Sequence, residues 1–92
     1  MNTKIIRLDP DELTNKYDMY DFMCEHLDCP SHFGKNLDAL HDILSEIEDE
    51  IDWIITMEDL QELSQDDYGY RTLMVIADAC DENEHLHLRF EK

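Results

Sequence analysis

The sequence is short of glycine, proline and positive charge. It contains two glycines, two prolines and seven lysines plus arginines among 92 residues. With glycine only at Gly34 and Gly69, the chain has no glycine-rich loop that cradles phosphate groups. The scarcity of cations opposes binding to nucleic acid, whose phosphates an acidic chain repels. No apolar run approaches the roughly 20 residues that a membrane-spanning helix needs, so we expect neither a nucleic-acid nor a membrane partner.

Cysteine is also scarce, with Cys24, Cys29 and Cys80 as the three examples. An odd number cannot pair completely within one chain, and we expect reduced, small, buried side chains. Cys24 and Cys29 resemble half of a metal site, but no second Cys/His pair follows at ligand spacing. Residues 1–8 lack the apolar core and cleavage site of a secretory signal, which favours a cytoplasmic location.

Most of the charged residues are acidic. Twenty-four acids give a formal net charge of −17, while an apolar content of 42% is sufficient for a globular fold. The length predicts a single domain over residues 1–92. Between Asn36 and Tyr70 there is no lysine or arginine, and we expect this window to form one unbroken acidic surface suited to a basic partner. The window holds half of the acids: Asp38, Asp42, Glu46, Glu48, Asp49, Glu50, Asp52, Glu58, Asp59, Glu62, Asp66 and Asp67.

The first half of the chain predicts one strand followed by helices. Residues 4–8 are β-branched and apolar enough for a strand. Residues 9–12 follow as a turn or a first helical turn, since Pro10 suits an initial helical position. Apolar residues then recur at helical spacing over residues 16–27.

The second half repeats this order. Residues 46–50 are rich in acids that repel one another, so we expect a loop or a frayed turn here. A calcium-binding loop is the alternative, but this segment lacks the central glycine that such a loop needs. Residues 51–57 predict a buried strand of a sheet covered on both faces, with Trp53 in the core or at the rim of a site. The expected remainder is a helix over 58–63, a loop over 64–69, a helix from Tyr70 or Arg71 to about Asp81, and a strand over 85–90.

The alternation in the last strand separates two faces. Leu86, Leu88 and Phe90 are expected to face the core, and His85, His87 and Arg89 the other side. Two histidines two residues apart on a strand can chelate a metal, although no third ligand is evident and a polar strand face is favoured. Three strands separated by helices predict an α/β fold with a small parallel sheet.

The most informative stretch is Pro30–Leu44, which predicts a loop leading into a helix. Gly34 is expected to supply backbone freedom, and Asn36 to cap the helix N-terminus. The apolar side of the helix comprises Leu37, Leu40, Ile43, Leu44 and Ile47. Asp38 and Asp42 lie together on the polar side, at a repulsive cost of roughly 0.2–0.5 kcal/mol. A solvated polar face is the alternative interpretation of these acids.

The run Phe33-Gly34-Lys35-Asn36-Leu37-Asp38-Ala39-Leu40-His41-Asp42-Ile43-Leu44 resembles the signature of the barstar family. That signature is an aromatic pair, Gly, a charged residue, Asn-Leu-Asp-Ala-Leu, Trp, Asp and two apolar positions. The resemblance implies a three-stranded parallel sheet flanked by about four helices. It also implies an inhibitor that blocks the cationic active site of a ribonuclease, with carboxylates in place of RNA phosphate.

The resemblance assigns roles to residues of this chain. Asp42 would enter the phosphate site, with Asp38 and Asp78 as flanking anchors. Lys35 replaces a glutamate of the family prototype, and His32 and His41 replace a tyrosine and a tryptophan. The implied partner-binding residues are His32, Phe33, Gly34, Asn36, Asp38, Ala39, His41, Asp42 and Asp78.

The same residues are also compatible with functions other than inhibition. Asp38 and His41 could form an acid–base pair, but nothing indicates the pocket that catalysis needs, and we expect no enzyme and no cofactor. An acidic interaction module for another basic protein, such as a nucleic-acid mimic, is the main alternative. Metal binding through His85 and His87 is the third. The expected partner is a basic ribonuclease of the extracellular or toxin type, and the expected free state is a monomer.

Overall fold

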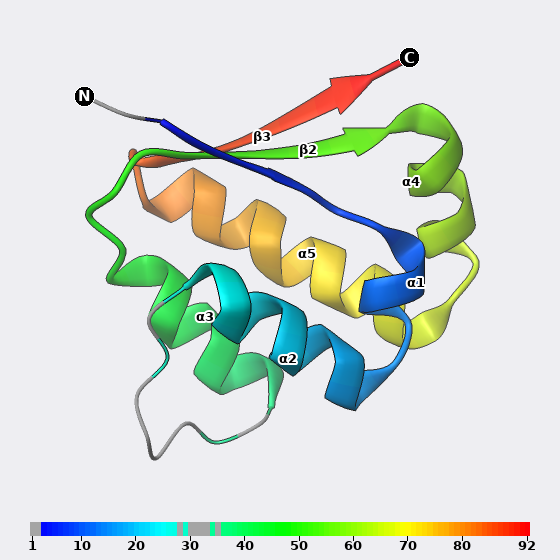
Figure 1. Cartoon of the computed structure of the whole chain (residues 1–92), viewed down its shortest axis with the longest axis horizontal. Helices are drawn as coiled ribbons and strands as arrows, with labels where there is room; N and C mark the ends of the chain where they lie inside the picture. The colour runs from blue at the N-terminus through cyan, green and yellow to red at the C-terminus, as the bar shows by residue number, and fades with distance from the viewer. Residues whose placement is uncertain (1–2, 28, 30–33, 35) are drawn as a thin grey trace.

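The computed structural model describes residues 3–27, 29, 34 and 36–92, and its chain alternates strands with helices (Figure 1). The elements are β1 (Lys4–Arg7), α1 (Pro10–Leu13), α2 (Lys16–His26), α3 (Leu37–Ser45), β2 (Ile51–Thr56), α4 (Met57–Ser64), α5 (Asp67–Glu82) and β3 (Leu86–Glu91). This order confirms the predicted α/β fold.

The three strands form one parallel sheet in the order β1-β2-β3. Ile6 of β1 pairs with Trp53 of β2, and Trp53 pairs with Leu88 of β3. The chain between β1 and β2 contains α1, α2 and α3, and the chain between β2 and β3 contains α4 and α5. The described residues form five helices where about four were implied, because Asp9 caps α1 as a separate short helix by accepting a hydrogen bond from the Asp11 N–H at 3.0 Å.

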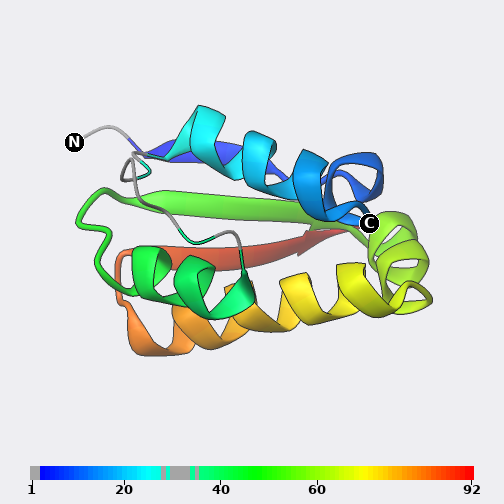
Figure 2. The ribbon, with the colours of Figure 1, turned by 90° about the horizontal axis from the view of Figure 1, so that it is seen from below.

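The helices α2, α3 and α5 lie on one side of the sheet, and α4 lies at its end (Figures 1 and 2). The expectation of a sheet covered on both faces is therefore wrong. Along β2 the side chains alternate between buried and half-buried, so only every second one faces the helices. On the other face Asp52 pairs with Arg89, at 3.2 Å between its Oδ2 and the Arg89 Nη1. The adjacent Ile54 and Ile55 gave the run its continuous apolar appearance, although they point to opposite faces.

The core lies between the sheet and the helix layer. Trp53 is 0% exposed, which places this side chain in the core and not at the rim of a site. On β3 the prediction is correct for the buried Leu86 and the half-buried Leu88, but Phe90 is 53% exposed. The end of β3 diverges from the helices in Figure 1, so the last apolar position of this edge strand has little to pack against.

The start of α5 differs from the predicted one. Residues 67–69 belong to the helix, whereas the sequence predicted a loop through Gly69. Asp66 is the reason, because its Oδ2 accepts a hydrogen bond from the Gly69 N–H at 2.7 Å and caps the helix. This cap outweighs the low helix propensity of glycine.

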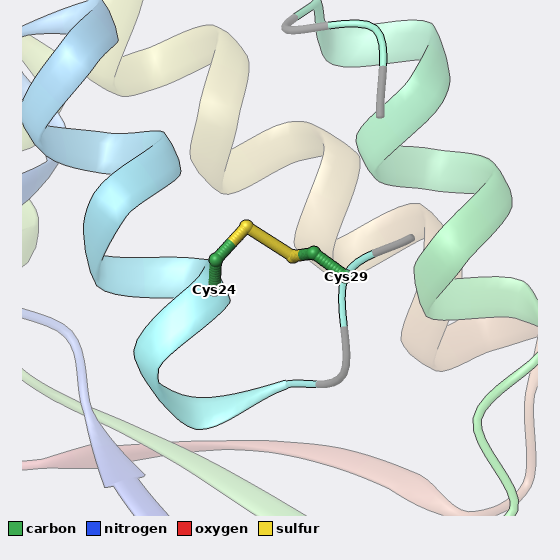
Figure 3. The surroundings of a disulfide bond; sticks show 2 residues. All are labelled: Cys24 and Cys29. Carbon is green, nitrogen blue, oxygen red and sulfur yellow. A yellow bond between two sulfur atoms is a disulfide. The ribbon is translucent and has the colours of Figure 1, made fainter. Parts of the chain in front are cut away.

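The cysteines correct a further expectation. Cys24, in the last turns of α2, forms a disulfide with Cys29, and their Cα atoms are 5.4 Å apart (Figure 3). Cys24 is also exposed, so the expectation of a reduced, buried side chain is wrong for this pair. The odd number of cysteines required only that one of them remain unpaired, and that residue is Cys80, a half-buried thiol. Burial, together with the nearby Asp81, raises the pKa of Cys80 to about 11.

Candidate functional site

The N-terminus of α3 is built as the sequence predicted. The Asn36 side chain accepts a hydrogen bond from the Ala39 N–H at 2.8 Å, which satisfies one of the free donors of the first turn. The Asn36 N–H donates to the carbonyl oxygen of Gly34 at 2.6 Å. The expected backbone freedom of Gly34 stays a prediction, because its φ depends on Phe33, which lies outside the described residues. The candidate residues His32 and Phe33, and the neighbouring Lys35, lie outside the described residues.

Two buried leucines hold α3 against the core. Leu40 and Leu44 are both 0% exposed and point inward from consecutive turns. Asp38 and Asp42 lie on the opposite side of the helix and are exposed, as predicted, while Ala39 is half-buried. Packing on one side therefore presents the two carboxylates on a fixed segment of helix.

The helices α3 and α5 lie side by side and run in the same direction (Figure 2). Nε2 of His41 on α3 is 2.8 Å from Oε2 of Glu82 on α5, with side chains 33% and 60% exposed. Asp78 is exposed and precedes Glu82 by one turn, just as Asp38 precedes His41 by one turn. The structure thus places Asp38, Asp42 and Asp78 on adjoining helices with His41 between them.

A residue that the sequence analysis missed fixes the other end of α3. Asn83, directly after α5, is 8% exposed, and its Nδ2 donates to the carbonyl oxygens of Leu44 and Ile47 at 2.9 Å each. Its Oδ1 accepts a hydrogen bond from the His85 N–H at 3.0 Å. One amide thus joins the C-terminal ends of the two helices. The sequence offered only a turn signal here, because the partners are 36 and 39 residues away.

The arginines of the described residues pair with acids away from this face. Arg7 lies 3.4 Å from Asp59, Arg89 lies 3.2 Å from Asp52, and Arg71 lies 3.4 Å from Asp67. The predicted acidic surface over residues 36–70 is therefore interrupted by cations at Asp52, Asp59 and Asp67. Within the described part of the chain, no ion pair involves Asp38, Asp42 or Asp78.

The two histidines of the β3 region surround a carboxylate. Nδ1 of His85 lies 2.8 Å from Oε1 of Glu50, and Nε2 of His87 lies 3.4 Å from Oε2. The hydrogen bond with His85 lowers the pKa of Glu50, and the same bond raises the pKa of His85. Within residues 3–27, 29, 34 and 36–92, no group of three or more His, Cys, Asp or Glu side chains is arranged to hold a metal ion.

A cleft of about 600 Å³ lies behind α3, between the end of α2 and the start of β2. Its walls include Cys29 on one side and Ile43, Glu46 and Ile47 on the other. None of the candidate acids lines it, so the exposed face of α3 and α5 is separate from this cleft. No helix in the described ranges is both long enough and apolar enough to span a bilayer.

Comparison with protein families places the chain in a known one. The family model described as Barstar (barnase inhibitor) matches residues 3–91, which is almost the whole chain. A search of the curated proteins gave no match. The family match covers α3, α5 and all three strands, and therefore every element from which the candidate site is built.

Proposed function

Because this chain belongs to the Barstar family, we propose that it inhibits a ribonuclease by placing carboxylates in the enzyme's cationic active site. The family implies a partner of the ribonuclease type. Our proposal adds a basic ribonuclease, of the extracellular or toxin type, as that partner, a cytoplasmic location, and a monomeric free inhibitor. The protein itself catalyses nothing in this scheme.

One observation carries the proposal: Asp38, Asp42 and Asp78 are exposed on two adjoining helices and are not ion-paired within the described residues. A carboxylate already paired with an arginine of its own chain would have to lose that partner before binding another. Within residues 3–27, 29, 34 and 36–92, no arginine or lysine imposes this cost on the three acids, in contrast to Asp52 and Asp59. What sets them apart from other exposed acids, such as Asp21 on α2, is that α3 and α5 place them on adjoining helices.

Ribonucleases hold the scissile phosphate with arginine, lysine and histidine side chains. A carboxylate in that position accepts charge-assisted hydrogen bonds from the same donors. Asp42 lies near the middle of α3 and takes the role of the phosphate, with Asp38 and Asp78 as flanking anchors. Because Leu40 and Leu44 fix α3 to the core, little side-chain and backbone freedom is lost on binding.

The remaining acids act at longer range. A net charge of −17 accelerates the approach of a basic partner, and added salt weakens this effect by screening. His41 is held beside the two aspartates by Glu82, where it limits how closely the partner approaches α3. Gly34, Asn36 and Ala39 shape the contact at the N-terminal end of the helix.

The first prediction tests Asp42. We expect Asp42→Ala to weaken binding to a basic ribonuclease by at least about 2 kcal/mol, or roughly thirtyfold, because the partner's buried cations lose their counter-charge. The magnitude is what the family match implies, because the barnase–barstar complex is itself a known example of such strong single-residue effects. The measurement is titration calorimetry with the wild-type protein and the variant, followed by inhibition of RNA cleavage.

Asp21→Ala is the matched control, because it removes the same charge from an exposed position near the middle of α2. We expect the control to bind as the wild type does, apart from a small loss in association rate at low salt. Equal inhibition by Asp42→Ala and the wild type would refute the assignment of Asp42. An equal loss in both variants would show that total charge, and not a built site, drives binding.

A further inference from the structure

The Cys24–Cys29 disulfide lies between α2 and the chain that leads to α3. Figure 3 shows the bond from the last turns of α2 to the segment that follows the helix. Cys24 is exposed, whereas Cys29 is half-buried and lines the cleft behind α3. Only six residues lie between Cys29 and Asn36, the residue that caps α3. The bond therefore fixes the chain shortly before the candidate site.

The end of α2 does not depend on this bond. Nζ of Lys4 donates to the carbonyl oxygen of His26 at 2.7 Å, and the Leu27 N–H donates to the carbonyl oxygen of Met23 at 2.8 Å. The Leu27 side chain is 8% exposed and belongs to the core. Opening the disulfide thus leaves α2 in place and removes the covalent link between α2 and Cys29.

We propose that Cys24 and Cys29 form a reversible thiol–disulfide site that controls how firmly the N-terminal turn of α3 is held. The oxidised form holds this turn more tightly than the reduced form. The consequence for affinity rests on the proposed function, since the same turn carries Asp38. The change in α3 itself does not depend on any partner.

A small thiol such as glutathione completes the chemistry. Its thiolate attacks Cys24, the more exposed sulfur, which breaks the protein S–S bond, forms a mixed disulfide and releases the Cys29 thiolate. A second glutathione thiolate attacks the glutathione sulfur of the mixed disulfide and releases the Cys24 thiolate. Each Cys thiolate then takes up a proton. Two glutathiones are oxidised to one glutathione disulfide, and the protein disulfide is reduced to two thiols.

The short ring and the exposed position of Cys24 favour a reversible bond over a purely structural one. The ring is short, with a sequence separation of five, and the chain entropy that a disulfide removes from the unfolded state is smallest for short rings. The third cysteine does not compete for Cys24 or Cys29. Cys80 is half-buried and remains a protonated, unreactive thiol near neutral pH, because burial raises its pKa to about 11.

The test needs no partner. Protein treated with excess reduced glutathione should gain two hydrogens by mass and two alkylatable thiols, and excess glutathione disulfide should reverse both changes. Hydrogen exchange at the Ala39 and Leu40 amides, which bond to Asn36, should then be several-fold faster in the reduced form. Exchange within α5 should not change. A disulfide that resists glutathione in the folded protein, or equal exchange in both forms, would overturn the proposal.

Variants separate this site from other thiol effects. The double variant Cys24→Ser/Cys29→Ser should match the reduced wild type under both conditions, and Cys80→Ser should respond as the wild type does. With a bound ribonuclease, reduction should raise Kd about threefold to tenfold, through the added ordering cost. If no ribonuclease binds either form, the proposed function fails while the exchange result still decides the thiol–disulfide site.

Discussion

At the scale of single residues, the environment distinguishes acids that the sequence makes look alike. Asp42 and Asp52 both lie in the window that lacks lysine and arginine. Asp52 is paired with Arg89, whereas Asp42 is exposed and has no ion pair within the described residues. Helical periodicity predicted the exposure of Asp42. Its lack of a cation was not predictable, because Arg7 and Arg89 reach their partners from opposite ends of the sequence.

Asn83 provides a prediction at this scale. Asn83→Ala should lower the free energy of unfolding by about 1–3 kcal/mol, since it leaves the carbonyl oxygens of Leu44 and Ile47 without their donor. Urea denaturation measures the change. Asn83→Asp keeps the shape but replaces the donor with an acceptor, so it should be at least as destabilising. A loss below about 0.5 kcal/mol in both variants would contradict the role assigned to this amide.

The Glu50–His85 pair predicts a pH dependence. The pKa of His85 is raised from 6.5, so its contribution to stability is complete below pH 6.5 and is lost as pH rises through the raised value. The pKa of Glu50 is lowered from 4.5, so its contribution is complete above pH 4.5 and is lost as pH falls through the lowered value. Both contributions are therefore complete between pH 4.5 and pH 6.5, and the pair stabilises the fold most in this range. The negative charges of Glu48 and Glu84 also favour protonated His85.

The measurement is the melting temperature at about pH 6 and about pH 9. The wild type should lose more of its melting temperature over this range than Glu50→Gln, in which the protonated histidine has lost its carboxylate partner. Glu58→Gln, at an exposed position on α4, makes the same charge change away from the histidines and should follow the wild type. Parallel curves for the wild type and Glu50→Gln would show that the pair contributes nothing.

At the scale of elements, local signals predicted most of the secondary structure. Asn36 gave the start of α3 correctly, because N-capping is a short-range interaction that the sequence specifies. The predicted start of α5 was wrong. Asp66 and Asp67 both precede Gly69, and the sequence did not show that Asp66 caps the helix. The sequence also did not show that Leu63 and Thr14, from other parts of the fold, lie close enough to Gly69 to contact a Cβ atom there.

Gly69 gives a prediction for this element. A Cβ atom on Gly69 would lie 2.7 Å from Cδ2 of Leu63, which is 0% exposed and has little room to move. We expect Gly69→Ala to destabilise the protein by up to about 2 kcal/mol, because the clash exceeds the gain in helix propensity. Gly34→Ala is the control: its nearest contact would be Asn36 Nδ2 at 3.4 Å, and its stability should change little. Equal stabilities for the two variants would contradict the tight packing at Gly69.

At the scale of the whole molecule, the order of elements predicted the parallel sheet, because helices between strands leave few other arrangements. Long-range features were not predictable in the same way. The open face of the sheet, the exposed Phe90 and the Cys24–Cys29 bond all depend on how segments meet in space. The candidate site was predicted through its helix and its resemblance to a family, while Asn83 and Glu82 became visible only in three dimensions.

The topology has a consequence for when the candidate site exists. The acids of α3 belong to the connection between β1 and β2, and Asp78 belongs to the connection between β2 and β3. Parallel strands cannot pair through a short hairpin, so both long connections must be completed before the sheet is assembled. A partner that contacts both helices therefore selects finished molecules over partly folded ones, and its binding reports on maturation of the entire chain.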